Sequence, residues 1–341
     1  MIRVGLIGAG FIGRVHFDQY DKLTDRARIV AICDKEPDRR AGRFSRIGGN
    51  LPGFAGQDRD LHDVRQYADW RDLLADADVD MVDICAPTFL HCEISVAALN
   101  AGKHVLCEKP MALNVHQCDD MLAAAARAKG KFMIAQCIRF WPEYVYLRQV
   151  FQDGRYGELK AVHFRRQAGI PGYSLNNWIL DPTLSGGGSL DLHVHDVDYA
   201  IQLLGKPKAV FAQAYQRAGG GIDRVHALWD YGPDRVVQLE GFWDMPGAFT
   251  FNMGYTAVFE KAGVHYDIGS GKPLTVYRNG TSETPAITGS DGYRAELEYF
   301  LDCIERDTAP TISTPVESRD AVALAMAERQ SARTGMPVSV A

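Results

Sequence analysis

Asp191 and His195 stand four residues apart and have the side chains of a general acid–base pair. An imidazole titrates near neutral pH, and a neighbouring carboxylate can orient the ring. Residues at positions i and i+4 of a helix project from the same face, and Asp198 would follow one turn later. Apolar residues at helical spacing predict that helix: Leu190, Val194, Val197, Ile201 and Leu204. The spacing therefore favours a pair that moves a proton.

Two other interpretations of this segment remain open. Asp191 and His195 could be capping and structural residues near the N-terminus of a helix. His193, His195 and the flanking aspartates also have the side chains of metal ligands. However, side chains at i and i+2 of a helix diverge by about 200° and cannot readily share one ion. We therefore expect no metal here.

A glycine-rich motif, GAGFIG, spans Gly8 to Gly13 between the apolar run Val4–Ile7 and a helical pattern. In a dinucleotide site Gly8 allows the sharp turn, Gly10 lets the backbone approach the pyrophosphate, and Gly13 lets the helix pack on the strand. The helix N-terminus offers N–H groups and a positive dipole end to the phosphates. Because the chain has 33 glycines, an accidental glycine turn is the alternative.

A second apolar run, Ile29–Cys33, ends at Asp34, roughly twenty residues after the last glycine of the motif. A carboxylate at this position would accept a hydrogen bond from the 2′-OH of the adenosine ribose and would repel a 2′-phosphate. We therefore expect NAD to be the preferred cofactor. Lys35, Arg39 and Arg40 could soften the repulsion, which leaves NADP possible.

A lysine, Lys109, follows a third apolar strand pattern in the sequence Glu108-Lys109-Pro110. A strand that ends here would put the ammonium at the carboxyl edge of the sheet, where open α/β sheets bind their ligands, so Lys109 could face the nicotinamide. A lysine after a strand is more often a solvated surface charge. Pro110 fixes an extended or cis corner, so the lysine does not lie on a free loop.

These residues need a scaffold, and residues 1–138 alternate between strand and helix patterns. We predict strands at 3–8, 29–34, 80–85, 104–107 and 132–137, and helices at 12–23, 71–76, 92–101 and 116–129. This alternation predicts an α/β fold, a Rossmann domain with a doubly wound parallel sheet. The Gly- and Pro-containing residues 48–56 are predicted to form a surface loop.

Residues 139–341 show a different pattern and are predicted to form a second domain. A helix at 142–153 is followed by strands at 159–167, 208–217, 223–231, 235–243 and 254–261, and helices at 291–306 and 316–334 end the chain. Successive strands without intervening helices imply antiparallel pairing. We therefore expect an α+β domain with a large, mostly antiparallel open sheet.

Composition narrows the class of protein. A chain of 341 residues suggests two domains, and 46% hydrophobic and 23% charged residues are typical of globular proteins. No apolar run approaches the ~18 residues that span a membrane, and the chain enters a strand directly, so we expect a cytoplasmic protein. Seven cysteines without a C-x-x-C pair indicate reduced thiols. A net charge of −6 argues against nucleic acid.

Three motifs together resemble the Gfo/Idh/MocA oxidoreductases, which include inositol dehydrogenases and glucose–fructose oxidoreductases. They are GAGFIG, the segment Ala101–Pro110, and Gly186-Gly187-Gly188 followed by Asp191-x-x-x-His195. The resemblance covers nearly the whole chain. It implies that Lys109, Asp191 and His195 are the catalytic residues and that the protein forms a homodimer or homotetramer.

The resemblance also implies a set of binding residues. The family's nicotinamide-side loop is matched by Ala86-Pro87-Thr88 and His91. Arg139-Phe140 matches a segment at the domain junction, where its role is open, and His193 stands where many members have a small residue. The resemblance and the motifs together imply these contacts to the cofactor: Gly8, Gly10, Phe11, Ile12, Gly13, Asp34, Ala86, Pro87, Thr88, His91, Glu108 and Lys109.

The implied activity is that of an NAD(P)-dependent dehydrogenase acting on CH–OH groups. His195 would take the proton of a secondary alcohol of a sugar, sugar derivative or cyclitol while the hydride moves to the nicotinamide. Lys109 would stabilise the developing carbonyl oxygen, and Asp191 would orient His195. We expect Asn176, Asn177 and Trp178 to contact this polyol or sugar substrate, although an ordinary loop is nearly as compatible with them.

Two other functions remain open at this point. One is a glycoside-cleaving enzyme that uses bound NAD for a transient oxidation. The other is a non-catalytic sensor of a dinucleotide or sugar. The presence of Lys109, Asp191 and His195 argues against the sensor, but it does not exclude the glycoside-cleaving enzyme.

Overall fold

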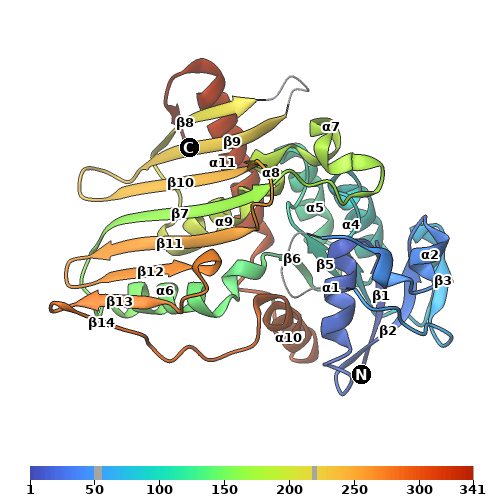
Figure 1. The fold of residues 1–341 in the computed structure, drawn as a ribbon. Helices are drawn as coiled ribbons and strands as arrows, with labels where there is room; N and C mark the ends of the chain where they lie inside the picture. Colours follow the sequence, from blue (N-terminus) through green and yellow to red (C-terminus); the bar gives the residue numbers. More distant parts are fainter. Residues whose placement is uncertain (50–55, 217–220, 341) are drawn as a thin grey trace. The chain divides into compact units, whose positions relative to one another are not determined.

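The computed structural model describes residues 1–49, 56–216 and 221–340, which form two compact units (Figure 1). The first unit comprises Met1–Cys137, Gly172–Ile179 and Asp291–Arg319. The second comprises Ile138–Pro171, Leu180–Ser290 and Asp320–Ala341. Each unit contains one sheet. Within the described residues, no helix combines the length and hydropathy needed to cross a membrane.

The sheet of the first unit is parallel throughout, as predicted. Its strand order is β3-β2-β1-β4-β5-β6. The order reverses beside β1, and ligands of such sheets bind at the carboxyl ends of the strands at this switch point. The polar strand β3 has only three residues and was not predicted, because no apolar run marks it. The strands are β1 Ile2–Ile7, β2 Ala27–Cys33, β3 Arg65–Tyr67, β4 Met81–Ile84, β5 His104–Glu108 and β6 Phe132–Ala135.

Helices connect these strands at nearly the predicted places. They are α1 Phe11–Tyr20, α2 Pro37–Arg40, α3 Trp70–Ala75, α4 His91–Asn100 and α5 Val115–Ala125, with 3-10 turns η1 Phe44–Arg46, η2 Thr88–Leu90 and η3 Cys137–Arg139. Asn114 caps α5, since its side chain accepts the backbone N–H of Gln117. Of the predicted loop at 48–56, residues 50–55 lie outside the described residues.

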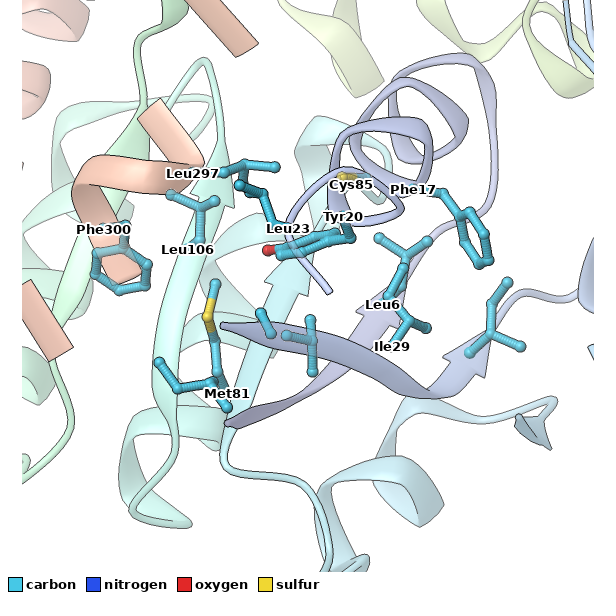
Figure 2. Close-up of a cluster of buried hydrophobic side chains, with 14 of the residues drawn as sticks. Leu6, Phe17, Tyr20, Leu23, Ile29, Met81, Cys85, Leu106, Leu297 and Phe300 are labelled. Atoms are coloured by element: carbon cyan, nitrogen blue, oxygen red, sulfur yellow. The ribbon is translucent and has the colours of Figure 1, made fainter. Parts of the chain in front are cut away.

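The core of the first unit includes a helix from far along the chain. Leu297 and Phe300 of α10, Gly292–Glu305, are buried with Leu106 and Met81 of the sheet (Figure 2). Tyr20, from the end of α1, lies among the same side chains. Burying a leucine or phenylalanine stabilises a fold by about 1.5–3 kcal/mol. Helix α10 is therefore an integral part of the first unit.

The second unit contains a nine-stranded sheet in the order β14-β13-β12-β11-β7-β10-β9-β8-β15 (Figure 1). All its strand pairs are antiparallel except β7 with β10, which confirms the mostly antiparallel sheet. The short strands at both edges were not predicted. The strands are β7 Leu159–Gly169, β8 Ala209–Gln216, β9 Ile222–Asp230, β10 Val236–Met245, β11 Asn252–Phe259, β12 Gly263–Asp267, β13 Thr275–Arg278, β14 Thr281–Glu283 and β15 Val338–Ser339.

Helices cover one face of this sheet. Tyr144 of α6 makes edge contacts with Tyr199 of α9 and with Tyr255 of β11, at ring distances of 4.9 and 5.2 Å. On the other face, Leu228, Val258 and Tyr277 are about half exposed. The helical elements are α6 Pro142–Asp153, η4 Leu175–Leu180, α7 Pro182–Ser185, α8 Gly188–Asp191, α9 Val194–Leu204, η5 Ile268–Ser270 and α11 Pro315–Thr334; η4 lies mostly in the first unit and α11 starts there.

Candidate active site

The turn from β1 into α1 fits a dinucleotide. Gly8 has φ +93°, and a Cβ there would lie 2.5 Å from the carbonyl oxygen of Cys85. A Cβ on Gly13 would lie 2.0 Å from the carbonyl oxygen of Gly8, so packing alone requires both glycines. At Gly10, in contrast, a Cβ would have only Arg39 within 4 Å among the described residues. Packing within the protein therefore does not require a glycine at position 10, and the missing side chain of Gly10 leaves room for a ligand.

The N-terminus of α1 is suited to an anion. Gly10 caps the helix without a side-chain hydrogen bond, and the first turn contains no acidic residue. The N–H groups and dipole of this turn are therefore not offset by an acidic residue of the helix itself. Phe11, at the first position of α1, makes an edge contact with Tyr173 at 5.5 Å. These features fit the pyrophosphate of NAD, and Gly10, Phe11, Ile12 and Gly13 would hold it.

Asp34 follows β2, and its carboxylate is tied to the backbone on both sides. Its Oδ2 accepts the N–H of Ala9 at 2.8 Å, and its Oδ1 accepts the N–H of Glu36 at 2.9 Å. Arg39 Nη1 lies 3.8 Å from Asp34 Oδ2. Since each carboxylate oxygen can accept more than one hydrogen bond, Asp34 can still bind a ribose hydroxyl. Arg39 is therefore a cation beside this carboxylate that could contact a 2′-phosphate.

Replacing Asp34 by asparagine is expected to shift cofactor preference toward NADP. The ratio of kcat/KM with NAD to that with NADP should fall by about tenfold or more, because the repulsion of a 2′-phosphate is lost. Steady-state kinetics with both cofactors measures this ratio. Arg39→Gln is the matched control and should change the ratio in the opposite direction. An unchanged ratio in Asp34→Asn would show that Asp34 does not set the preference.

His91 joins the two loops that follow β4 and β5. Its Nδ1 lies 2.8 Å from the carbonyl oxygen of Pro110, and its Nε2 lies 2.9 Å from that of Ala86. Burial lowers the pKa of His91, although the two carbonyls oppose this effect. The neutral ring donates to one of the two carbonyl oxygens. His91 thus positions the Ala86-Pro87-Thr88 loop beside the loop of Lys109, and its direct contact with the cofactor stays a prediction.

Lys109 lies directly after β5, at the carboxyl edge of the parallel sheet. The buried side chain of Glu108 accepts the backbone N–H of Lys109, with Oε2 at 3.0 Å from the nitrogen. Lys109 itself is partly buried, and its peptide bond to Pro110 is cis. The sheet edge, the hydrogen bond to Glu108 and the contact between Pro110 and His91 together fix the backbone that carries the ammonium.

Asn176, Asn177 and Trp178 belong to the first unit, although they follow strand β7 in sequence. Both asparagines are exposed and have φ near +50° (53° and 52°), a conformation that asparagine tolerates better than most residues. Trp178 is partly buried. Their contact with a substrate stays a prediction.

The segment that carries Asp191 and His195 is not the single helix that the sequence predicts. It forms α8 and α9, which are separated at Leu192 and His193. The N–H of His193 bonds to the carbonyl oxygen of Gly188, five residues earlier, at 3.0 Å. This wider turn interrupts the helical period, so the i, i+4 argument does not by itself place the two side chains together. Asp191 is partly buried, and His195 is buried.

His193 has a structural partner in the second unit. Its Nε2 lies 2.9 Å from Glu328 Oε2, and Trp229 donates to Glu328 Oε1 at 2.6 Å. His193 and Glu328 are buried. A Cβ on Gly241 would lie 2.7 Å from His193 Nδ1, so the sheet needs a glycine opposite the ring. His193 thus connects the α8–α9 turn to α11.

Arg139 forms a buried ion pair with Asp198 of α9. Its Nε lies 2.5 Å from Asp198 Oδ2, and its Nη2 lies 2.8 Å from Oδ1. Both side chains are fully buried. This bidentate pair links the start of the second unit to the helix that carries His195. Asp198 therefore holds α9 in place, whereas the sequence suggested only that it shares a face with His195.

Replacing Arg139 by methionine is expected to destabilise the protein by about 3–5 kcal/mol, because Asp198 would keep a buried charge without its partner. Urea denaturation measures the free energy of unfolding. The matched control is Arg224→Met, which removes a partly exposed pair with Asp244 and should cost no more than about 1 kcal/mol. Equal effects of the two variants would contradict the role of the buried pair.

A group of buried polar residues in the first unit was not predicted. His16 belongs to two sets of residues that have the side chains of metal ligands, one with Asp83 and Cys85 and the other with Glu108 and Glu296. The ligand atoms within each set lie within 4.8 Å of one another. The only signal for this group in the sequence was His16 itself, a polar residue on the buried face of α1. Its partners could not be identified because they are distant in the chain.

Comparison with known families gives two matches. A family model described as "Oxidoreductase family, NAD-binding Rossmann fold" (GFO_IDH_MocA) matches residues 2–136. A second, described as "GFO/IDH/MocA C-terminal domain", matches residues 144–265. The matches therefore cover most of both halves of the chain.

Two curated relatives are dehydrogenases. Inositol 2-dehydrogenase of Rhizobium meliloti (strain 1021) is 27% identical, over 100% of this chain and 99% of that protein. D-glucoside 3-dehydrogenase of Escherichia coli (strain K12) is 31% identical, over 64% of this chain and 59% of that protein.

Solved structures share the fold. Levoglucosan dehydrogenase in complex with NADH and levoglucosan has a TM-score of 0.84 at 21% identity, covering 99% of both chains. Aldose-aldose oxidoreductase from Caulobacter crescentus, complexed with glycerol, has a TM-score of 0.83 at 22% identity, again covering 99% of both chains.

Proposed function

The chain belongs to the Gfo/Idh/MocA family of NAD-binding oxidoreductases, and from this premise we propose that it oxidises a secondary alcohol of a sugar, sugar derivative or cyclitol. The observation that carries the proposal is the position of Lys109. It follows β5 at the carboxyl edge of the sheet whose β1–α1 turn fits the dinucleotide. Relatives that act on inositol, glucosides and levoglucosan support a polyhydroxylated substrate.

Bound NAD supplies the hydride acceptor. The Lys109 ammonium stabilises the negative charge that develops on the substrate oxygen, since a fixed cation at that oxygen favours the transition state over the ground state. His195 accepts the hydroxyl proton, and Asp191 orients the imidazole. Lys109 belongs to the first unit, whereas Asp191 and His195 belong to the second. We propose that Asn176 or Asn177 forms hydrogen bonds with the substrate and that Trp178 packs against it.

A substrate panel tests this function. The purified protein is incubated with NAD and, separately, with free sugars, cyclitols and nitrophenyl glycosides, while nicotinamide absorbance and nitrophenol release are followed. Net reduction of NAD by a free sugar or cyclitol is the expected result. Nitrophenol release without net reduction would favour the glycoside-cleaving enzyme. NAD binding without any turnover across the panel would favour a sensor.

The proposal extends to assembly into a homodimer or homotetramer. The open face of the nine-stranded sheet carries several half-exposed apolar side chains, which a second copy of the chain would cover. They are Tyr215, Leu228, Val236, Val258 and Tyr277. Light scattering on the purified protein measures the mass in solution, and a monomeric mass at micromolar concentration would contradict assembly.

A further inference from the structure

A fully buried histidine in the first unit faces carboxyl groups on both sides of its ring. His16, on α1, contacts Asp83 of β4 through Nδ1 at 2.9 Å, as a hydrogen bond. Its Nε2 lies 3.1 Å from Oε1 of Glu108, at the end of β5. The three residues come from three different elements of the nucleotide-binding unit. One imidazole therefore spans the distance between two carboxyl groups at adjacent strands.

The charge of the ring follows from these neighbours. Burial alone lowers the pKa of His16, but Asp83 and Cys85, through charge and hydrogen bonds, outweigh burial and raise the pKa well above its ordinary value. Tyr20 also donates to Asp83 Oδ2 at 3.0 Å, and the Cys85 thiol lies 3.4 Å from Oδ1. The hydrogen bond of the ring to a carboxylate is made through Nδ1, whereas Nε2 has no hydrogen-bond partner among the described residues and only lies near the Glu108 carboxylate.

Glu296 of α10 completes the cluster as a neutral group. Its side chain is fully buried, and its Oε1 lies 3.7 Å from His16 Nε2. Burial raises the pKa of Glu296 well above its ordinary value, and the charges of Glu108, Asp83 and Asp291 add to this, although His16 opposes them. Burial and these charges thus favour the neutral form of Glu296 over a third negative charge in this cluster.

Glu108 connects this cluster to the proposed catalytic lysine. Its Oε1 faces His16, whereas its Oε2 accepts the backbone N–H of Lys109 at 3.0 Å. The two oxygens of the Glu108 carboxylate therefore have different partners: Oε1 contacts the His16 ring, and Oε2 accepts the backbone N–H of Lys109. A shift of the Glu108 side chain would move the peptide from which the Lys109 side chain extends.

We propose that His16 and Glu108 are positioning residues for Lys109, holding its backbone through one buried chain of contacts that starts on the nucleotide-binding helix α1. The proposal rests on the proposed function of Lys109. It predicts that a substitution that breaks one of these contacts lowers kcat, because the Lys109 side chain is displaced. The glycine turn should continue to bind NAD. A misplacement of about 1 Å at a catalytic group can cost up to about a hundredfold in rate.

Glu108→Gln tests the central link. An amide has one acceptor oxygen, so the variant side chain must lose either the contact to His16 or the bond to Lys109 N–H. We expect kcat to fall by about tenfold or more, and by a larger factor than the affinity for NAD. His16→Gln, which lacks the ring nitrogen and the charge that face Glu108, should behave in the same way. An unchanged kcat in a folded Glu108→Gln protein would overturn the proposal.

A double-mutant cycle separates positioning from general structural damage. In a Lys109→Ala background, Glu108→Gln should lower kcat by less than about twofold, because the group that it positions is absent. Additive losses would overturn the positioning role and leave the proposed function intact. Full turnover in Lys109→Ala alone would instead overturn the proposed function. If His16→Gln does not fold, the cycle with Glu108→Gln still decides the question.

Two variants on α10 serve as controls. Asp302→Asn removes a negative charge that lies 2.6 Å from Arg26 and should leave kcat unchanged. Glu296→Gln replaces a protonated carboxyl by a neutral amide and should also keep kcat within about twofold of the wild type. A large loss of kcat in Glu296→Gln would show that Glu296 is charged, and a stoichiometric metal ion in the purified protein would show that the ring is not an imidazolium. Either result would overturn the proposed charges.

Stability provides a readout that is independent of catalysis. Because the pKa of Glu296 is raised on folding, the folded protein holds a proton that the unfolded chain releases above its ordinary value of 4.5. The contribution of Glu296 to the free energy of unfolding is therefore present at low pH and is lost as the pH rises toward the folded-state pKa of this carboxyl. In urea denaturation across this range, Glu296→Gln should show a shallower loss of stability than the wild type. Parallel pH profiles would contradict the protonated state.

Discussion

His195→Ala is expected to lose most of its turnover and, with it, the acid limb of the pH–rate profile. A base must be neutral to accept the substrate proton, so the wild-type rate should rise with pH as one imidazole proton dissociates and should then level off. Loss of a general base typically costs about 10²–10⁴-fold in rate. The measurement is kcat/KM for the best substrate of the panel as a function of pH.

His193→Asn is the control for this experiment, because it changes a histidine two positions away. His193 contacts Glu328 through Nε2 at 2.9 Å, so its loss should lower stability and leave the acid limb in place. A His195→Ala enzyme that keeps both its rate and its acid limb would show that another group carries the proton.

Lys109→Ala is expected to lower turnover by about a hundredfold or more through the loss of charge stabilisation in the transition state. The affinity for NAD should be largely kept, because the glycine turn at the start of α1 supplies the pyrophosphate contacts. Steady-state kinetics gives kcat, and a binding titration gives the dissociation constant. Near wild-type turnover would remove Lys109 from the mechanism.

Lys103 offers a matched control at the other end of β5. Its ammonium donates to the carbonyl oxygens of Asp76 and Val79 at 2.8 and 2.6 Å, away from the carboxyl edge of the sheet. Lys103→Ala removes the same charge and the same type of side chain, but at the opposite end of strand β5. Turnover should stay within about twofold of the wild type, so a large loss would mean that net charge rather than position matters.

Much of the fold could be predicted from local patterns, because buried strands leave apolar runs and tight turns need glycine. The parallel sheet and the turn at Gly8 are of this kind. Strand β3 was missed because Arg65–Tyr67 pairs with β2 through its backbone without contributing an apolar run. The division between α8 and α9 was missed because Leu190 and Val194 keep helical spacing across the wider turn at His193.

The partners of the polar residues could not be predicted from the sequence alone. Asp83 is 67 residues from His16, and Glu328 is 135 residues from His193. Spacing rules describe contacts within one helix or strand, whereas these pairs are set by how distant elements pack. The sequence identified Lys109 by its motif, but the contacts that hold its backbone became apparent only with the tertiary structure.

The contribution of α10 to the core of the first unit bears on how the chain folds during synthesis. The parallel sheet is complete once Phe132–Ala135 has left the ribosome, but Leu297 and Phe300 are made only after eight of the nine strands of the second sheet, which end at Thr281–Glu283. Until then the apolar surface around Leu106 and Met81 has no cover from this helix. Domains made first usually fold first, and contacts between distant segments form slowly. Here the nucleotide-binding unit begins early in translation and is completed near its end.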